Sequence, residues 1–330
     1  MLTNVPLRIG FLLFEGFSNM VLASAIEPLR AACDLSGQEL VAWQLLTVDG
    51  EPVRSSSALV LQPRGALSGA SELDILFVVV GYGAREHCSG QVLSALKLAA
   101  QRVPVLGGLD TGAWLLAAAG LLDGRRATIH WQELDAFEET FLSVSMSTDR
   151  LVFEGERITA GGATTVLELM LRLIRDFGGD ALAFDVANMF VYDVERVLQQ
   201  GRGALSPSLL VRAPQLIRAI EEMRRTADDP VGLEEIAAAA ACSQRTLDRL
   251  FQRELGLPPG RYYQMIRLKL ARTLAEETAL SVAEIASRTG FSSVATLSRA
   301  FSKHFGLSVR SLRKGRLNRP ITGYYDAARR

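Results

Sequence analysis

The chain has 330 residues and no net charge, with 36 basic and 36 acidic side chains. This length predicts two domains, each large enough to bury its own core. The charge is unevenly divided: residues 1–204 carry 15 Lys and Arg against 24 Asp and Glu, a net of −9, whereas residues 205–330 carry 21 against 12, a net of +9. An acidic domain joined to a basic one indicates that the second meets a polyanion, either a nucleic acid or a membrane surface.

The three cysteines, Cys33, Cys88 and Cys242, are far apart and lack the spacing of metal ligands. They argue against a disulfide framework and favour a reducing compartment. The first residues lead into a strand-like stretch without the anatomy of a signal peptide. Since no apolar run reaches about 18 residues, we expect no transmembrane helix. We also expect no metal and no cofactor, and a cytoplasmic location.

Residues 1–195 alternate between predicted strands and helices. Short unbroken apolar runs that end in Gly or Asp predict strands at Leu7–Leu13, Ile75–Gly81 and Val103–Leu109. Helical patterns occupy residues 18–34, 89–102, 111–119, 131–141, 163–177 and 180–195. This alternation predicts an α/β domain of the flavodoxin-like kind, in which helices cover both faces of a parallel sheet.

The rest of the chain has no strand candidate. Residues 196–210 are rich in Gly, Gln, Ser and Pro, which predicts a linker. Residues 211–318 are helical in pattern and predict an all-α domain. Residues 319–330, with a proline, a glycine and charged ends, predict a loose tail.

The all-α region contains an internal repeat at an offset of about 50 residues. The segment LEEIAAAAACSQRTLDRLFQRELG begins at Leu233, and SVAEIASRTGFSSVATLSRAFSKHFG begins at Ser281. Each copy reads as a short helix, a tight turn, a serine N-cap and a second helix. The caps are Ser243 in the first copy and Ser292 or Ser293 in the second. The repeat therefore predicts two helix-turn-helix motifs.

The second helix of each copy has an apolar stripe and an opposite polar face. The stripes are predicted to be core: Leu247, Leu250 and Phe251 in the first copy, and Leu297, Ala300 and Phe301 in the second. The opposite faces have the chemistry that reads base edges, because arginine suits guanine, small apolar groups suit thymine methyls and hydroxyls suit either. For any single residue, a solvated helix face remains the alternative.

The sequences RELGLPPGRYYQMIRLKLARTLAEET and IASRTGFSSVATLSRAFSKHFGLSVRSLRK resemble the AraC/XylS family of bacterial regulators. The resemblance spans about 105 residues and implies that two recognition helices enter successive major-groove segments of double-stranded DNA, roughly 34 Å apart. The positions that it assigns to DNA are Arg245, Asp248, Arg249, Val294, Ala295, Thr296, Ser298 and Arg299, to which the polar face adds Lys303. Arg249 and Arg299 occupy equivalent places. Asp248 would either accept from a cytosine amine or hold Arg245.

Residues 107–131, GGLDTGAWLLAAAGLLDGRRATIHW, predict a buried strand, a sharp turn at Asp110 and a helix that starts at Thr111. Such an elbow displays a side chain at the carboxyl edge of a sheet. This stretch and the opening LRIGFLLFEGFSNMVLASAIEPLRAA resemble the ThiJ/PfpI group of the class I glutamine amidotransferase-like fold. The closer resemblance, over residues 5–195, is to GlxA-like regulators, in which this domain is fused to an AraC-type tail.

The enzymes of this group carry a cysteine where this chain has Asp110, and an acidic residue near Met20–Val21, where it has none. Thiolate chemistry needs both the sulfur and the control of its pKa, so we reject a cysteine hydrolase or an amidotransferase. An aspartate nucleophile is chemically possible, but His130 is the one plausible base in this domain. We therefore expect a non-catalytic domain.

Two interpretations of Asp110 stay open. It is either the N-cap of the following helix or a ligand-binding carboxylate that selects a cation. Aromatic side chains that could form a wall for an ammonium group are Phe14, Tyr82, Trp114 and Trp131. The predicted ligand-binding residues are Asp110, Thr111, Phe14, Glu15, Tyr82, His130 and Trp131. His130 alone could instead be a hydrogen-bonded core residue.

The resemblance implies a sensor of a small amine or amino acid, since regulators like this one include sensors of arginine, glycine betaine and carnitine. It further implies an activator that works with RNA polymerase and forms a homodimer through the α/β domain. Two alternatives remain. One is a constitutive DNA-binding protein whose α/β domain only dimerises, and the other is a hydrolase that uses Asp110 and also binds DNA.

Overall fold

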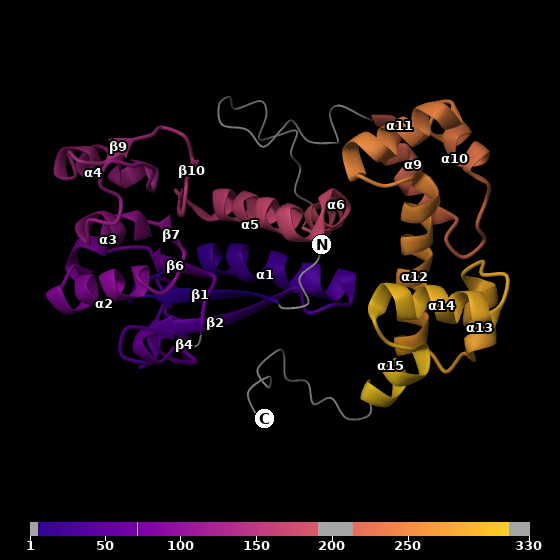
Figure 1. Cartoon of the computed structure of the whole chain (residues 1–330), viewed down its shortest axis with the longest axis horizontal. Coiled ribbons are helices and arrows are strands. Elements are labelled where there is room, and N and C mark those ends of the chain that lie inside the picture. Colours follow the sequence, from indigo (N-terminus) through magenta and orange to yellow (C-terminus); the bar gives the residue numbers. More distant parts are fainter. Residues whose placement is uncertain (1–5, 71, 191–213, 317–330) are drawn as a thin grey trace. The chain divides into compact units, whose positions relative to one another are not determined.

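The computed structural model describes residues 6–70, 72–190 and 214–316, which form an α/β unit and a helical unit (Figure 1). The predicted linker at 196–210 and the predicted tail at 319–330 lie outside the described residues. No helix in these ranges is both long and apolar enough to cross a membrane.

The α/β unit contains a seven-stranded sheet with the strand order β10-β11-β7-β6-β1-β2-β5. The strands are β1 (Leu7–Leu13), β2 (Val41–Thr47), β5 (Gly65–Ala66), β6 (Ile75–Val80), β7 (Val105–Asp110), β10 (Leu151–Glu154) and β11 (Arg157–Ala160). Every neighbouring pair is parallel except the edge hairpin of β10 and β11. The predicted parallel sheet is confirmed, whereas the antiparallel edge strand was not predicted.

Both faces of the central strands are buried. Phe11 and Phe77 stack on one face with ring centroids 5.7 Å apart, while Leu12 and Val78 share a core with α2 and α3 on the other. Because neither face is exposed, these strands are mostly apolar and do not alternate with polar residues. This is why the three predicted strands lie within one or two residues of β1, β6 and β7.

The helices of this unit confirm the predicted alternation. They are α1 (Asn19–Ser36), α2 (Gly90–Ala100), α3 (Gly112–Ala118), α4 (Leu134–Thr140), α5 (Ala163–Gly178) and α6 (Asp180–Met189), although residues 34–36 of α1 and 180–184 of α6 group with the helical unit. Short 3₁₀ turns, η1 (Leu67–Gly69), η2 (Ala84–His87) and η3 (Trp131–Glu133), lie between them. Two small strand pairs, β3 (Val53–Arg54) with β4 (Val60–Leu61) and β8 (Arg126–Ala127) with β9 (Ser145–Met146), complete the unit.

The parallel strands bring three loops together at the carboxyl edge of the sheet. The amide of Tyr82, after β6, donates to the carbonyl of Gly16, after β1, at 3.3 Å. A Cβ on Gly81 would lie only 2.4 Å from that same carbonyl oxygen, so the loops can meet this closely only with glycine at this position. The elbow after β7 joins them through the amide of Thr111, which donates to Val80.

The helical unit contains α9 (Pro214–Arg225), α10 (Leu233–Ala239), α11 (Gln244–Leu255), α12 (Pro259–Glu277), α13 (Val282–Arg288), α14 (Val294–Phe305) and α15 (Val309–Arg316). It has two cores. Tyr262 of α12 packs with α9, α10 and α11, whereas Leu268 of α12 packs with α13, α14 and α15. No strand occurs within residues 214–316, which confirms the predicted all-α organisation. In Figure 1, α12 runs through both halves of this unit.

Candidate functional sites

The elbow at Asp110 is a strained turn held tightly against the sheet. Asp110 ends β7 with a φ of 62°, a left-handed conformation that is uncommon for a residue other than glycine. The neighbouring glycines leave no room for a side chain, since a Cβ would lie 2.5 Å from the Ala113 amide at Gly108 and 2.1 Å from the Val78 carbonyl at Gly112. The motif GGLDTG therefore encodes a rigid turn that presents one side chain.

The carboxylate of Asp110 is buried and does not cap the next helix. The N-cap of α3 is Thr111, without a side-chain capping bond, so the interpretation of Asp110 as an N-cap is wrong. Asp110 is 8% exposed, and its carboxylate accepts no hydrogen bond from any described residue. Burial raises its pKa to about 6, and the positive charge of His130 opposes the rise. A buried carboxylate without a hydrogen-bond donor is energetically unfavourable, and a bound cation would stabilise it.

His130 lies beside Asp110, at the start of η3. Its amide donates to the carbonyl of Asp110 at 3.1 Å, and its Nδ1 accepts from the amide of Gln132 at 3.4 Å. When the imidazole is neutral, the proton is therefore on Nε2. The backbone at Gly161 packs directly against the residue before His130, since a Cβ on Gly161 would lie only 2.6 Å from the carbonyl oxygen of Ile129. The site thus combines a carboxylate with an imidazole N–H donor.

The predicted aromatic residues separate into two groups. Tyr82 and Trp131 are 74% and 70% exposed, and the Trp131 ring lies 5.7 Å from the His130 ring. Phe14 and Trp114 are buried in the core of the α/β unit. The Trp114 ring packs against Phe137 and Phe141 and is also covered by a guanidinium. Only the first pair is open to a ligand.

The remaining predicted site residues hold the loops in place. The hydroxyl of Thr111 donates to the carbonyl of Gly81 at 2.7 Å, which ties the elbow to the loop after β6. The Glu15 carboxylate accepts from the amide of Arg54 at 3.0 Å, and the Glu15 carbonyl lies 3.0 Å from Nε2 of His87. Their side-chain groups therefore already have partners within the protein.

An ion pair beside this edge was not predicted. Arg85 of η2 contacts Glu133 of η3 at 3.0 Å, and its guanidinium lies 4.5 Å from the centre of the Trp114 ring. The two residues are 48 positions apart, and neither stands in a recognisable motif. No sequence signal could have paired them, because only the fold brings η2 and η3 together.

The described residues contain no activated thiol near the elbow. Cys33 is buried in α1, and its sulfur lies 3.7 Å from the Val41 carbonyl. Burial raises the pKa of Cys88, which is opposite to what a nucleophilic thiolate needs. Met20 and Val21, where the resemblance to the enzymes places an acidic residue, lie in the first turn of α1, and this turn contains no acid. No group of three potential metal ligands occurs in the described ranges.

The structure contains both predicted helix-turn-helix motifs, α10–α11 and α13–α14. Ser243 caps α11 and Ser293 caps α14, each accepting from the amide three residues on at 3.2 Å. Both helices end at a left-handed glycine, Gly256 and Gly306. The predicted core stripes are buried, apart from the half-buried Ala300.

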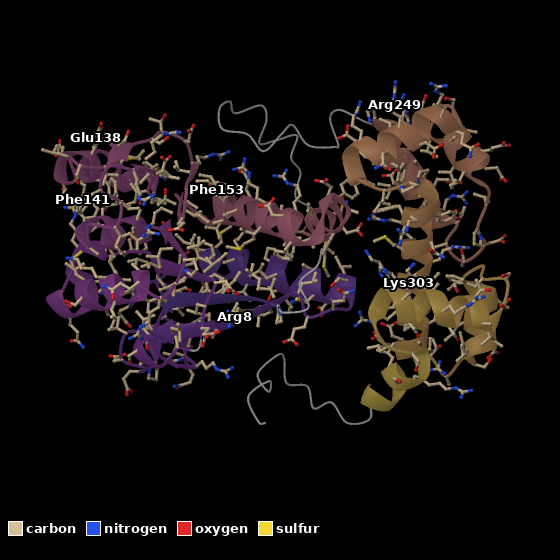
Figure 2. All side chains as sticks on the ribbon, in the orientation of Figure 1. Arg8, Glu138, Phe141, Phe153, Arg249 and Lys303 are labelled. Carbon is tan, nitrogen blue, oxygen red and sulfur yellow. The ribbon has the colours of Figure 1, made fainter. Side chains whose placement is uncertain are left out.

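The predicted base-reading residues differ in exposure. The exposed ones are Arg245, Asp248, Arg249, Val294, Ala295, Arg299 and Lys303, and the half-buried ones are Thr296 and Ser298. Figure 2 marks Arg249 on α11 and Lys303 on α14. The Thr296 hydroxyl lies 2.9 Å from that of Ser293, so part of its hydrogen-bonding capacity serves the cap. Thr246 does the same beside Ser243 in the first motif.

Comparisons with known proteins match both units. The helix-turn-helix domain model matches residues 236–315, and the DJ-1/PfpI family model matches residues 7–176. The HTH-type transcriptional regulator GbdR of Pseudomonas aeruginosa is 36% identical over 96% of this chain and 87% of its own length. The chain belongs to the GlxA-like transcriptional regulators. The HTH-type transcriptional regulator GlxA of Rhizobium meliloti is 35% identical over 93% of this regulator and 95% of its own length.

The same fold also includes an enzyme. Isonitrile hydratase of Pseudomonas putida is 30% identical to this regulator over 63% of the chain and 88% of the enzyme. That match covers less of the chain than the matches to the two regulators. The family membership of the full chain is therefore that of DNA-binding transcription regulators with an AraC-type helix-turn-helix domain.

Proposed function

We propose that this regulator senses a small amine or amino acid at Asp110 and changes its control of transcription in response. The observation that carries the proposal is the Asp110 carboxylate, which is buried, strained at φ 62° and without a hydrogen-bond donor among the described residues. A cationic group would supply the missing partner. The exposed rings of Tyr82 and Trp131 offer aromatic faces to an ammonium group.

The ligand class proposed is a zwitterion such as arginine, glycine betaine or carnitine. Its cationic end would face Asp110, and its carboxylate would accept from Nε2–H of His130. The proposal includes domains at 1–195 for sensing and dimerisation and 211–318 for DNA binding, joined by a linker at 196–210. It also includes activation with RNA polymerase, a homodimer and a cytoplasmic location.

The test is titration calorimetry of the full chain against arginine, glycine betaine and carnitine between pH 5 and pH 8. The ordinary pKa of an aspartate is 3.8, and that of Asp110 is raised to about 6, so the ligand-free site holds a proton below pH 6. A cation must displace that proton. The affinity for the ligand should therefore be constant above pH 7 and fall up to tenfold per pH unit below pH 6.

Asp110→Asn is the matched control, because it keeps the shape of the side chain and removes its charge. We expect this variant to bind the ligand weakly and without the pH dependence. Wild-type affinity in Asp110→Asn would remove the proposed role of the carboxylate. A chain that binds none of the panel would favour a constitutive regulator whose α/β domain only dimerises.

We further propose that the α/β unit is not catalytic. The absence of an activated cysteine among the described residues near the elbow supports this proposal, as does the missing acid at the start of α1. A hydrolase using Asp110 is the alternative. Turnover of glyoxals or amides by the wild-type chain, abolished in Asp110→Asn, would establish that alternative.

A further inference from the structure

The two helix-turn-helix motifs of the helical unit meet at the middle of α12. The first half of this helix packs in the core of α9–α11 through Tyr263, and its second half packs in the core of α13–α15 through Leu268. Arg267 stands between these two residues in the sequence. It therefore lies on α12 where one core ends and the other begins.

The Arg267 side chain contacts both motifs at once. Its guanidinium carbon lies 5.6 Å from the centre of the Tyr263 ring and 4.9 Å from that of the Phe291 ring. Its Nη1 donates to the carbonyl of Gly290 at 3.0 Å. Gly290 and Phe291 belong to the turn between α13 and α14, so this contact joins the first core to the turn that precedes the second recognition helix.

Burying the Arg267 side chain lowers the stability of the fold. Nε of Arg267 is buried and has no hydrogen-bond partner, and none of the described carboxylates forms an ion pair with this residue. Burial lowers the pKa of the guanidinium below its usual range. An unpaired buried N–H destabilises the fold relative to an apolar side chain of similar size. This cost favours a role in fixing geometry.

Pro230, in the loop between α9 and α10, completes the junction. Gly290 has a φ of 65°, and a Cβ there would lie 2.1 Å from Cγ of Pro230. The loop that carries Pro230 is itself fixed, because the Tyr263 hydroxyl donates to the Thr226 carbonyl at 2.8 Å and accepts from the Val231 amide at 3.3 Å. The first motif thus touches the second along two routes.

We propose that Pro230, Tyr263, Arg267, Gly290 and Phe291 form a clamp that fixes α11 relative to α14, with Arg267 as its positioning residue. The clamp sets the number of base pairs between the two half-sites that these helices read. One inserted base pair moves the second half-site by about 3.4 Å along the duplex and turns it by about 35°. A rigid pair of helices follows such a change only by bending the DNA, which costs binding free energy.

The experiment uses the full chain and duplexes that it selects from a random pool. The selected sequence is remade with one or two base pairs inserted or deleted between the half-sites, and each affinity is measured by fluorescence anisotropy. The wild-type affinity should fall at least tenfold for a change of one base pair. In Arg267→Met, which keeps the length of the side chain and removes the guanidinium, the fall should be less than threefold.

Arg310→Met is the matched control, because it removes an exposed arginine from α15 of the same unit. It should change all affinities by one common factor and keep the wild-type spacing profile. Tyr263→Phe is the second variant, since it keeps the ring under Arg267 and loses the hydroxyl that fixes the Pro230 loop. Tyr263→Phe should also reduce the loss of affinity caused by a change in spacing. If Arg267→Met does not fold, the spacing profile of Tyr263→Phe tests the clamp.

A wild-type spacing profile in the folded Arg267→Met variant would overturn the clamp, as would a wild-type chain that tolerates every spacing. The clamp rests on DNA reading by α11 and α14. Failure of that reading has a different signature, because no sequence would then be selected from the pool, and the clamp would fall together with DNA reading by α11 and α14. The effector proposal at Asp110 is unaffected by any of these results.

Discussion

The two helix-turn-helix motifs share one backbone plan and differ in the exposed residues at the start of their second helices. Both recognition helices have 12 residues, a serine N-cap, a threonine three residues later and a left-handed glycine at the end. At the first two helical positions, however, α11 carries Gln244 and Arg245, where α14 carries Val294 and Ala295. The two copies therefore share the residues that shape the helix and the equivalent arginines Arg249 and Arg299, and they differ at the first two helical positions.

This difference indicates that the two half-sites are unlike. Gln and Arg form paired hydrogen bonds with adenine and guanine, whereas Val and Ala contact thymine methyls. A single chain would therefore bind a site whose two halves differ in sequence, and this site would not be a palindrome. Each prediction below changes equivalent positions in α11 and α14 and asks whether the two motifs respond alike.

The largest effect is expected from the two equivalent arginines. Arg249→Ala and Arg299→Ala should each weaken binding to the selected duplex by about 1–3 kcal/mol, roughly 5–150-fold, because each loses a base contact. Binding to random DNA should change much less. Anisotropy titrations with both duplexes measure this difference. Equal losses on specific and random DNA would instead assign the arginines to phosphates.

The N-caps should respond alike. Ser243→Ala and Ser293→Ala each remove one capping bond of the same length, so each should lower the free energy of unfolding by about 1 kcal/mol. Urea denaturation of the full chain, followed by circular dichroism, measures the change. Ser311→Ala, on the capped first turn of α15, is a control outside both motifs. A cap that contributes only in one motif would show that the two backbones are not equivalent.

The first helical positions should respond differently. Val294 is 42% exposed although it is apolar, so we expect it to cover a thymine methyl. Replacing that thymine with deoxyuridine should cost about 0.8 kcal/mol, roughly fourfold in affinity, the value of one methyl group. Val294→Ala should abolish this sensitivity, whereas Gln244→Ala should keep it. Loss of the sensitivity in Gln244→Ala would place the methyl contact on α11.

The smallest effect concerns the salt dependence of binding. Lys303 of α14 has no ion-pair partner among the described residues, whereas Arg253, its equivalent on α11, pairs with Glu254. Lys303→Ala should lower the slope of log affinity against log salt by about 1, the effect of one lost phosphate contact. Arg253→Ala should lower it by less. A larger change for Arg253 would mean that its ion pair opens on DNA.

The parts of the fold that follow a periodic pattern were predictable, and those that depend on contacts between distant segments were not. The runs at β1, β6 and β7 are unbroken because both faces are covered, and the repeat revealed both recognition helices. The strands β10 and β11 were missed because each has only four residues in a charged hairpin.

The candidate sites divide in the same way. The turn at Asp110 follows from GGLDTG, but its lack of a capping bond does not, because capping depends on side-chain direction. Trp114 was expected near a ligand, whereas the structure packs it in the core between Phe137 and Phe141. The position of Arg267 could not be predicted from the sequence, because its contact with the carbonyl of Gly290 joins residues that are 23 positions apart.

The buried carboxylate at the elbow links the stability of the protein to the pH and to the binding of the proposed cationic ligand. Because the folded-state pKa of Asp110 is raised to about 6, its contribution to stability is retained at low pH and decreases as the pH rises from about 4 to 6. Above pH 6 the ligand-free chain holds a negative charge on a mostly buried carboxylate. A cation that neutralises it should raise the melting temperature at neutral pH in proportion to RT ln(1 + [L]/Kd). A thermal-shift screen of metabolites at pH 7.5 and pH 5 would therefore separate true effectors from compounds that stabilise the protein equally at both.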